Sequence, residues 1–120
     1  MIQHIVLFTP KPGLDNNSRR AFASATLSTL RHSPDISRFT VGRRVTVDAG
    51  YERSFGADPY EYAAVLEFEN QERLVRYLRS ADHEVLGRLF WESCERTVVT
   101  EVTVVNPADG VDALVADTDG

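Results

Sequence analysis

Hydrophobic residues recur at every second position in several short segments, a spacing typical of β-strands. The first segment, Ile2–Thr9, ends at the turn-forming run Pro10-Lys-Pro-Gly. Both of its faces are largely apolar, with Ile2, Val6 and Phe8 on one and Ile5 and Leu7 on the other. We therefore predict a first strand that is buried on both sides.

A helix and a second strand are predicted next. The run Asp15-Asn-Asn-Ser offers N-cap side chains for a helix that reaches about His32, where Ser33-Pro34 ends it. The segment Ile36–Val47 then alternates loosely around Gly42, which predicts a strand with a bulge at the glycine. Asp48–Pro59 is rich in glycine and proline and is predicted to be a loop.

The clearest strand of the chain is Tyr60–Glu69. Its apolar face consists of Tyr60, Tyr62, Ala64, Leu66 and Phe68. Asn70 is a predicted N-cap for a helix in which Glu72 and Arg76 form an i,i+4 pair. The inward face of this helix consists of Leu74, Tyr77 and Leu78.

The run Arg79-Ser-Ala-Asp-His83 interrupts the helical pattern. A further helix is predicted after it, with Val85, Leu86, Leu89 and Phe90 facing inward. Phe90 and Trp91 are expected to be core or dimer contacts first and pocket wall second. The β-branched segment Arg96–Val105 predicts the last strand.

The predicted order β-α-β-β-α(α)-β is the split-βαβ pattern of ferredoxin-like domains, so we expect an α+β fold with a four-stranded antiparallel sheet. Helices on one face leave the other face of the sheet to be covered. A second copy of the chain could cover it by closing a dimeric α/β barrel, and we expect a homodimer through the sheet face. Residues 1–105 form the predicted domain. Residues 106–120 are expected to be an acidic, disordered tail.

Charge narrows the range of partners. The formal net charge is −5, but the last fifteen residues hold four aspartates and no basic residue. The remaining chain has 13 basic and 14 acidic residues (18 less those four) and shows no basic stripe, which argues against nucleic acid and membrane partners. The single cysteine, Cys94, is expected to be a buried side chain. With no signal-like segment or membrane span apparent, we expect a cytoplasmic protein.

Four segments resemble the stress-responsive A/B barrel (Dabb) family. They are Ile2-Gln-His-Ile-Val-Leu-Phe, Val41-Gly42, Tyr60-Glu-Tyr-Ala-Ala-Val-Leu-Glu-Phe-Glu and Leu74-Val-Arg-Tyr-Leu-Arg-Ser-Ala-Asp-His83. The last is the most specific, because the family typically has a tyrosine, a short break and a histidine there. Where many members read His-Pro-x-His, this chain has Ser80-Ala-Asp-His83, without the first histidine and the proline.

The resemblance implies a dimeric ferredoxin-like barrel with a pocket between sheet and helices. One family enzyme, olivetolic acid cyclase, closes a polyketide ring without metal or cofactor. Its catalytic tyrosine and histidine match Tyr77 and His83, and its first-strand histidine matches His4. A second pocket histidine of that enzyme falls at Tyr62, so this part of the pattern is altered.

The residues themselves permit this chemistry. A histidine such as His83 titrates near neutral pH and can take up or release a proton, and Tyr77 could stabilise an oxyanion by a hydrogen bond. The alternative is that His83 only begins a helix while Tyr77 fills the core. His4 likewise is either a core histidine bonded to a tyrosine or a pocket residue beside Tyr60 or Tyr62. The residues expected to bind substrate are His4, Phe8, Tyr60, Tyr62 and Phe90.

Other chemistries lack a sequence signal. The three histidines and one cysteine show no metal-ligand spacing, and no phosphate-binding glycine motif is present, so neither metal nor cofactor is expected. Haem binding through one histidine stays conceivable. Three functions remain: a cofactor-independent cyclase, lyase or isomerase for a small carbonyl compound, a non-catalytic small-molecule-binding protein, or a stress-response assembly protein.

Overall fold

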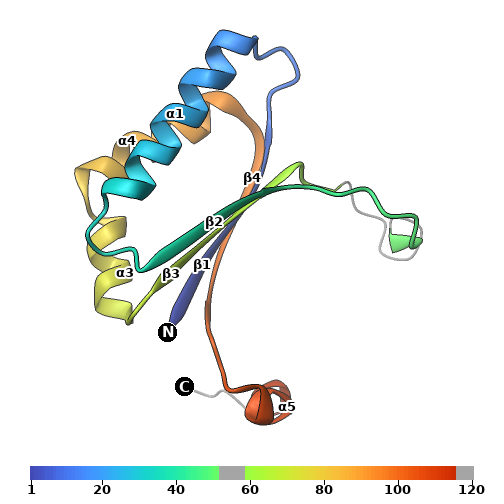
Figure 1. The fold of residues 1–120 in the computed structure, drawn as a ribbon, viewed down its shortest axis with the longest axis vertical. Helices are drawn as coiled ribbons and strands as arrows, with labels where there is room; N and C mark the ends of the chain where they lie inside the picture. Colours follow the sequence, from blue (N-terminus) through green and yellow to red (C-terminus); the bar gives the residue numbers. More distant parts are fainter. Residues whose placement is uncertain (52–58, 116–120) are drawn as a thin grey trace.

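The fold is one four-stranded sheet with three helices on one of its faces (Figure 1). The computed structural model describes residues 1–51 and 59–115. Its main elements are β1 (Ile2–Pro10), α1 (Asn16–His32), β2 (Arg38–Arg43), β3 (Tyr62–Phe68), α3 (Gln71–Leu78), α4 (Ala81–Ser93) and β4 (Cys94–Thr103). The strands are antiparallel in the order β2-β3-β1-β4. The predicted ferredoxin-like α+β architecture is therefore confirmed.

Strand β1 is central and carries the start of the functional site. It pairs with β3 and β4, and His4 lies opposite Leu66 on one side and Glu101 on the other. His4, Val6 and Phe8 are buried beneath the helices. The alternate residues, Ile5 and Leu7, are only half-buried, because the helices cover one face of the sheet. The predicted burial of β1 is therefore found on the face that the helices cover. The other face of β1 is only half-buried in the single chain.

Strand β2 is shorter and more regular than its sequence suggests. Gly42 lies directly opposite Ala63 in an unbroken register, so the predicted bulge is wrong. The pairing stops after the backbone N–H of Arg44 donates to the carbonyl of Glu61. Val45, which the sequence places in the strand, is 78% exposed. Of the predicted loop, residues 52–58 lie outside the described residues.

Side-chain caps begin the helices where the sequence predicts. Asp15 accepts a hydrogen bond from the backbone of Ser18 at the start of α1, and Asn70 accepts one from Arg73 at the start of α3. The predicted pair between Glu72 and Arg76 also forms, at 3.1 Å. These local bonds set where each helix begins and thereby which residues face the sheet.

Aromatic rings fill one end of the core. Phe8, Phe22 and Phe90 meet edge to face, with ring centroids 4.9 to 6.0 Å apart.

The prediction that Val85 of α4 faces inward is wrong, since Val85 is exposed. Residues Leu86, Leu89 and Phe90 form the apolar face of α4, and Val85 lies off that face. Trp91 is 85% exposed, so it is no core residue of the single chain.

The C-terminal segment is described as far as Val115. A turn of 3₁₀ helix, Pro107–Asp109, leads into the short helix α5, Gly110–Val115. Asn106 begins this segment, because its side chain accepts a hydrogen bond from the backbone of Ala108 while Pro107 fits the first helical turn. Helix α5 lies beyond the end of β4, away from the helical layer (Figure 1). Residues 116–120 lie outside the described residues.

Candidate active site

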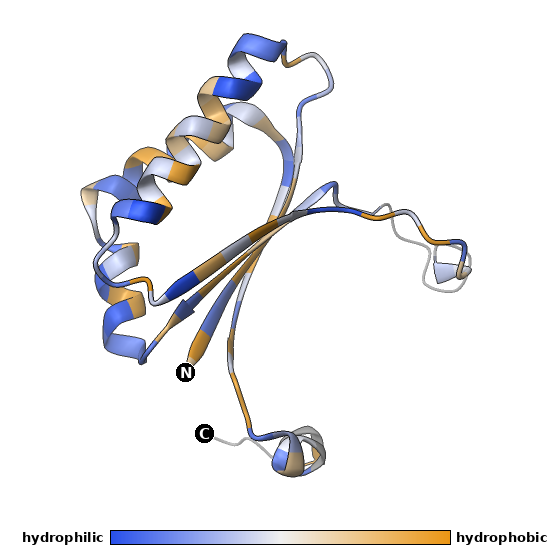
Figure 2. Ribbon diagram, viewed as in Figure 1, coloured by the Kyte–Doolittle hydropathy of each residue, from blue (hydrophilic) through white to orange (hydrophobic). Residues whose placement is uncertain are grey.

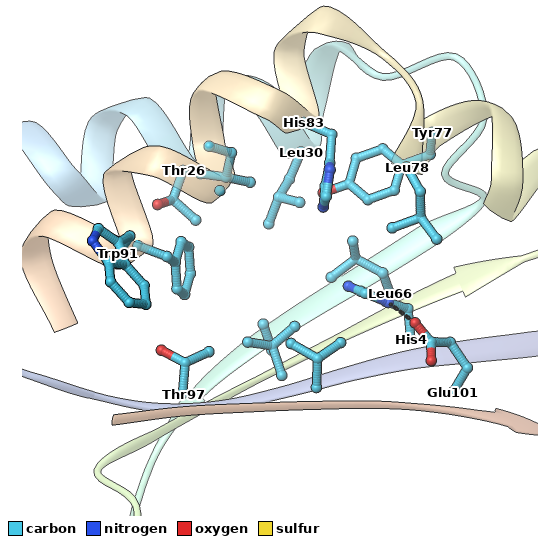
Figure 3. Close-up of a pocket in the computed structure, with 16 residues that line it drawn as sticks. His4, Thr26, Leu30, Leu66, Tyr77, Leu78, His83, Trp91, Thr97 and Glu101 are labelled. Carbon is cyan, nitrogen blue, oxygen red and sulfur yellow. Dashed lines mark hydrogen bonds and ion pairs between the residues drawn. The ribbon is translucent and has the colours of Figure 1, made fainter. Parts of the chain in front are cut away.

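A cavity of about 350 Å³ lies between the sheet and the three helices. We call it the inner cavity. Its floor comes from β1, β3 and β4, and its roof from α1, α3 and α4 (Figure 3). Most of its lining is apolar, including Val6, Leu30, Leu66, Leu86 and Phe90. A volume of this size is in the range of small-molecule sites, about 300–1,000 Å³.

Tyr77 and His83 meet at one end of the inner cavity. Their ring centroids are 4.9 Å apart and the rings stand edge to face. Figure 3 shows the Tyr77 hydroxyl beside the His83 imidazole, above the floor that holds His4. Tyr77 comes from the buried face of α3 and His83 from the first turn of α4, so the break between the two helices brings them together. The expected convergence of these two residues on one cavity is therefore observed.

Burial shifts the pKa values of both residues in the direction that keeps them uncharged. It raises the pKa of the Tyr77 hydroxyl to about 12, so this group stays a hydrogen-bond donor at neutral pH. Burial also lowers the pKa of His83 below 6.5, and the nearby His4 adds to this effect, while a hydrogen bond with the backbone of Leu78 opposes it. At neutral pH the His83 imidazole is therefore neutral and can accept a proton.

His4 forms a second polar pair on the floor of the cavity. Its Nδ1 lies 3.0 Å from Oε1 of Glu101 across the β1–β4 pairing. His4 is buried and the Glu101 side chain is partly exposed. The ring of His4 also meets Tyr77 edge to face at 6.2 Å. The hydrogen-bond partner of His4 is thus a carboxylate and not the tyrosine that the sequence reading considered.

Ser80 holds the helix break in shape. Its hydroxyl donates to the carbonyl of Tyr77 at 2.7 Å and accepts from the backbone N–H of His83 at 3.2 Å. Ser80 is thus both a brace for the end of α3 and the N-cap of α4. One side chain thus links the backbones of Tyr77 and His83.

Four of the predicted site residues line the inner cavity, namely His4, Tyr77, His83 and Phe90. Phe8 and Tyr62 instead line a second cavity on the other side of α1. Tyr60 lies against Arg96, whose guanidinium carbon is 4.4 Å from the centre of its ring. Sequence reasoning missed Glu101 and Ser80.

The other residues considered for chemistry have ordinary surroundings. His32 lies exposed at the end of α1, with Nδ1 2.7 Å from the carbonyl oxygen of Ser28. Cys94 is buried and unpaired, and burial raises the pKa of its thiol, so it is a weak nucleophile. Among residues 1–51 and 59–115, no group of three or more His, Cys, Asp or Glu side chains is placed to hold a metal ion. In the same part of the chain, every helix is too short or too polar to cross a membrane.

Three solved structures illustrate what the fold is similar to. Hydroxynitrile lyase from Passiflora edulis matches with a TM-score of 0.70 at 19% identity, over 88% of this chain and 94% of that one. A Dabb family protein with a ferredoxin-like fold from Mesorhizobium loti matches at 0.69 and 21%, over 88% and 97%. A dimeric ferredoxin-like protein of unknown function from Thermobifida fusca matches at 0.67 and 16%, over 86% and 90%. At these identities the likeness establishes the fold.

The sequence comparisons agree with the structural ones on the family. No curated protein matches the chain significantly. The family model for the stress responsive A/B barrel domain, Dabb, matches residues 2–104. The resemblance predicted from four sequence segments is therefore confirmed, and the chain belongs to the stress responsive A/B barrel domain family.

Proposed function

We propose that this protein is a cofactor-independent enzyme of the lyase, cyclase or isomerase type that acts on a small, largely apolar carbonyl compound. The observation that carries the proposal is the convergence of Tyr77 and His83 on one end of the apolar inner cavity. An uncharged base beside an uncharged hydrogen-bond donor, enclosed by apolar walls, suits proton transfer next to a carbonyl group.

In the proposed reaction, the neutral imidazole of His83 takes a proton from the carbon beside the substrate carbonyl. The electron pair of the broken C–H bond forms a carbon–carbon double bond, and the C=O π pair moves onto the carbonyl oxygen. The Tyr77 hydroxyl donates a hydrogen bond to the enolate oxygen that results. In ring closure, the enolate carbon bonds to the carbon of a second carbonyl group of the substrate, whose C=O π pair moves onto its own oxygen. In isomerisation, the delocalised anion takes a proton at a different carbon from the one that lost it. The imidazolium returns its proton to the atom that gains charge, so protons and electrons balance.

A lyase reaction would use the same base. His83 would take the proton of a hydroxyl group, the adjacent C–C bond would break as the carbonyl forms, and the carbon leaving group would receive the proton. The Passiflora edulis structure is named a hydroxynitrile lyase, an enzyme class that cleaves cyanohydrins into a carbonyl compound and hydrogen cyanide. This likeness supports testing lyase chemistry first, while the substrate of the present protein follows from its own cavity.

We also propose that two copies pair through the sheet face opposite the helices. Apolar residues recur along the strands (Figure 2), and helices α1, α3 and α4 cover only one face of the sheet (Figure 1). On the open face, Val98 and Val102 are 43% and 40% exposed. The Thermobifida fusca structure is described as dimeric, as are similar proteins from Bacteroides fragilis and Jannaschia.

The test of catalysis uses two probes and the substitution His83→Ala. The probes are mandelonitrile, whose cleavage releases benzaldehyde, and phenylacetone in D₂O, whose α-carbon takes up deuterium when a base removes its proton. We expect wild-type protein to accelerate at least one reaction and His83→Ala to lower the rate about a hundredfold or more. The substitution leaves the α4 cap intact, because Ser80 binds the backbone and not the side chain of residue 83.

His32→Ala is the matched control, since His32 is exposed on α1 and is not part of the inner cavity. Its activity should equal that of the wild type. Full activity in His83→Ala would remove His83 from the mechanism. Absence of turnover, combined with a retained small molecule in native mass spectrometry, would favour the alternative of a non-catalytic binding protein.

A further inference from the structure

A second cavity, of about 660 Å³, lies between α1 and the strands β1, β2 and β3. We call it the arginine-rimmed groove. Among the described residues, Thr26 alone lines both the groove and the inner cavity. Phe8 and Phe22 line the groove, Phe90 lines the inner cavity, and their three rings are in mutual contact. These rings separate the two cavities, so the groove is a distinct candidate site.

Two stacked aromatic rings line the groove. Phe8 and Tyr62 stack with their ring planes 19° apart and their centroids 5.4 Å apart. Phe8 is buried, whereas Tyr62 is half-buried and partly in contact with the groove. Leu27 of α1 and Val41 of β2 add apolar walls. Such a surface favours a planar apolar group.

The rim of the groove is cationic. Arg19 and Arg20 both line it, and none of the described residues that line it is acidic. The Nε of Arg19 donates to the carbonyl of Leu14 at 3.1 Å, which fixes this guanidinium and leaves its terminal nitrogens for other partners. Within residues 1–51 and 59–115, neither Arg19 nor Arg20 forms an ion pair. The inner cavity has the opposite character, with Glu101 and no arginine or lysine.

We propose that the arginine-rimmed groove binds a small planar organic anion, namely an aromatic ring that carries a carboxylate. The ring would lie against Tyr62, which stacks on the buried Phe8, and the carboxylate would accept hydrogen bonds from Arg19 and Arg20. A guanidinium group suits this role, since its donors match the two oxygens of a carboxylate. This site differs in charge and place from the one proposed for catalysis.

The probe for this site is 2-naphthoate, with the neutral 2-naphthamide as its matched control ligand. Both are titrated into ¹⁵N-labelled protein while backbone amide shifts are followed by NMR. We expect 2-naphthoate to shift the amides of Arg20, Ala23, Val41 and Tyr62, and 2-naphthamide to bind at least about threefold more weakly. Equal affinity for the two ligands would overturn the role of the arginines.

Two pairs of variants test the assignment. Arg20→Gln should weaken 2-naphthoate binding about three- to tenfold, whereas Arg31→Gln, an exposed arginine on the same helix outside the groove, should leave it unchanged. Ala23→Trp should block the groove, whereas Ala21→Trp, at an exposed position outside it, should not.

Three further results would overturn the proposal. The first is a set of shifts confined to inner-cavity amides such as those of His83 and Gly87. The second is no shift up to the solubility limit of 2-naphthoate. The third is a shift of the groove amides with protein concentration alone, which would show that a second copy of the chain fills the groove.

Discussion

Tyr77 and His83 show how one physical cause can prepare two groups for different tasks. Burial disfavours the charged form of each side chain, which raises the pKa of Tyr77 to about 12 and lowers that of His83 below 6.5. An acid that stays protonated therefore lies beside a base that stays free. The apolar wall of the inner cavity thus contributes directly to the proposed chemistry, because it sets both protonation states.

The lowered pKa of His83 predicts a pH dependence of both activity and stability. The rate should be constant at pH values well above the folded-state pKa, where the proposed base is neutral, and fall as the pH drops through that pKa. The unfolded chain binds a proton at a higher pH than the folded chain does. Stability from this group is therefore complete above about pH 6.5 and lost as the pH falls through the folded-state value.

An NMR titration of the imidazole C2–H signals measures this pKa directly. The signal that disappears in His83→Ala identifies the residue, and its midpoint is expected below 6.5. A midpoint at or above 6.5 would show that burial does not control this group. It would also leave the proposed base partly protonated at neutral pH.

Site residues that lie close together in the sequence could be predicted more readily than those that lie far apart in it. One continuous segment contains Tyr77, Ser80 and His83. Its resemblance to the family predicted Tyr77 and His83 as site residues. Glu101 lies 97 positions from His4, and only the β1–β4 register places it opposite. Valine and threonine occupy both faces of β4, so alternation alone does not reveal that Glu101 faces the helices. Likewise, the face assigned to Phe8 and Tyr62 is right, but the sequence does not show on which side of α1 a cavity forms.

At the scale of elements, the break between α3 and α4 is the part of the fold that most directly shapes the site. Helix α3 ends at Leu78 and α4 begins at Ala81, so few residues separate the two. Ser80 bonds to the backbone on both sides of the break. Because the bonds are to backbone atoms, they fix the helix ends, and the helix ends in turn fix where the Tyr77 and His83 rings lie.

Removing the Ser80 hydroxyl should therefore affect both stability and the site. We expect Ser80→Ala to lower the free energy of unfolding by about 0.5–2 kcal/mol, the usual cost of losing an N-cap side chain. Urea denaturation measures this change, and the ring signals of Tyr77 and His83 should shift in the same variant. Ser80→Thr is the matched control, because it keeps a hydroxyl and should retain most of the stability. A Ser80→Ala variant as stable as the wild type would show that the break is held by packing alone.

Features that depend on neighbouring residues, such as helix caps, could be predicted from the sequence. Features that depend on contacts with distant elements could be predicted less well. Asp15 and Asn70 cap helices because a short polar side chain reaches the backbone three residues away, whatever lies beyond. Strand β2 ends early because its length depends on what β3 offers for pairing, which its own sequence does not contain. Gly42 fits a regular strand as readily as a bulge. The exposure of Val85 follows from the rotation of α4 on the sheet, which tertiary packing decides.

At the scale of the whole molecule, the sheet has two unequal faces. One face carries α1, α3 and α4 (Figure 1) and forms the floor of the inner cavity. On the other face, apolar residues of β1, β3 and β4 are partly exposed. Val98 lies on this open face, opposite Leu7 in the β1–β4 register. Contiguous apolar surface of this kind is typical of an interface between proteins. Pairing through it would make each sheet a two-sided core and would account for the two apolar faces of β1 seen in the sequence.

A single charge on the open face tests this pairing. We expect light scattering on a sizing column to give the wild type twice the chain mass of 13.4 kDa, and Val98→Asp to give the monomer mass at the same concentration. The reason is that a buried carboxylate without a partner is costly, and a two-fold axis would bring two of them into one interface. The dimer dissociation constant should rise about a hundredfold or more.

Val85→Asp is the matched control, because Val85 is an exposed valine on α4 and is not part of the inner cavity. It should leave the dimer intact, which separates a loss of the interface from a general effect of added charge. A wild type that stays monomeric, or a Val98→Asp variant that stays dimeric, would place any interface elsewhere. Because the inner cavity lies on the opposite side of the sheet, His83-dependent turnover should persist in a folded Val98→Asp monomer if the two faces act independently.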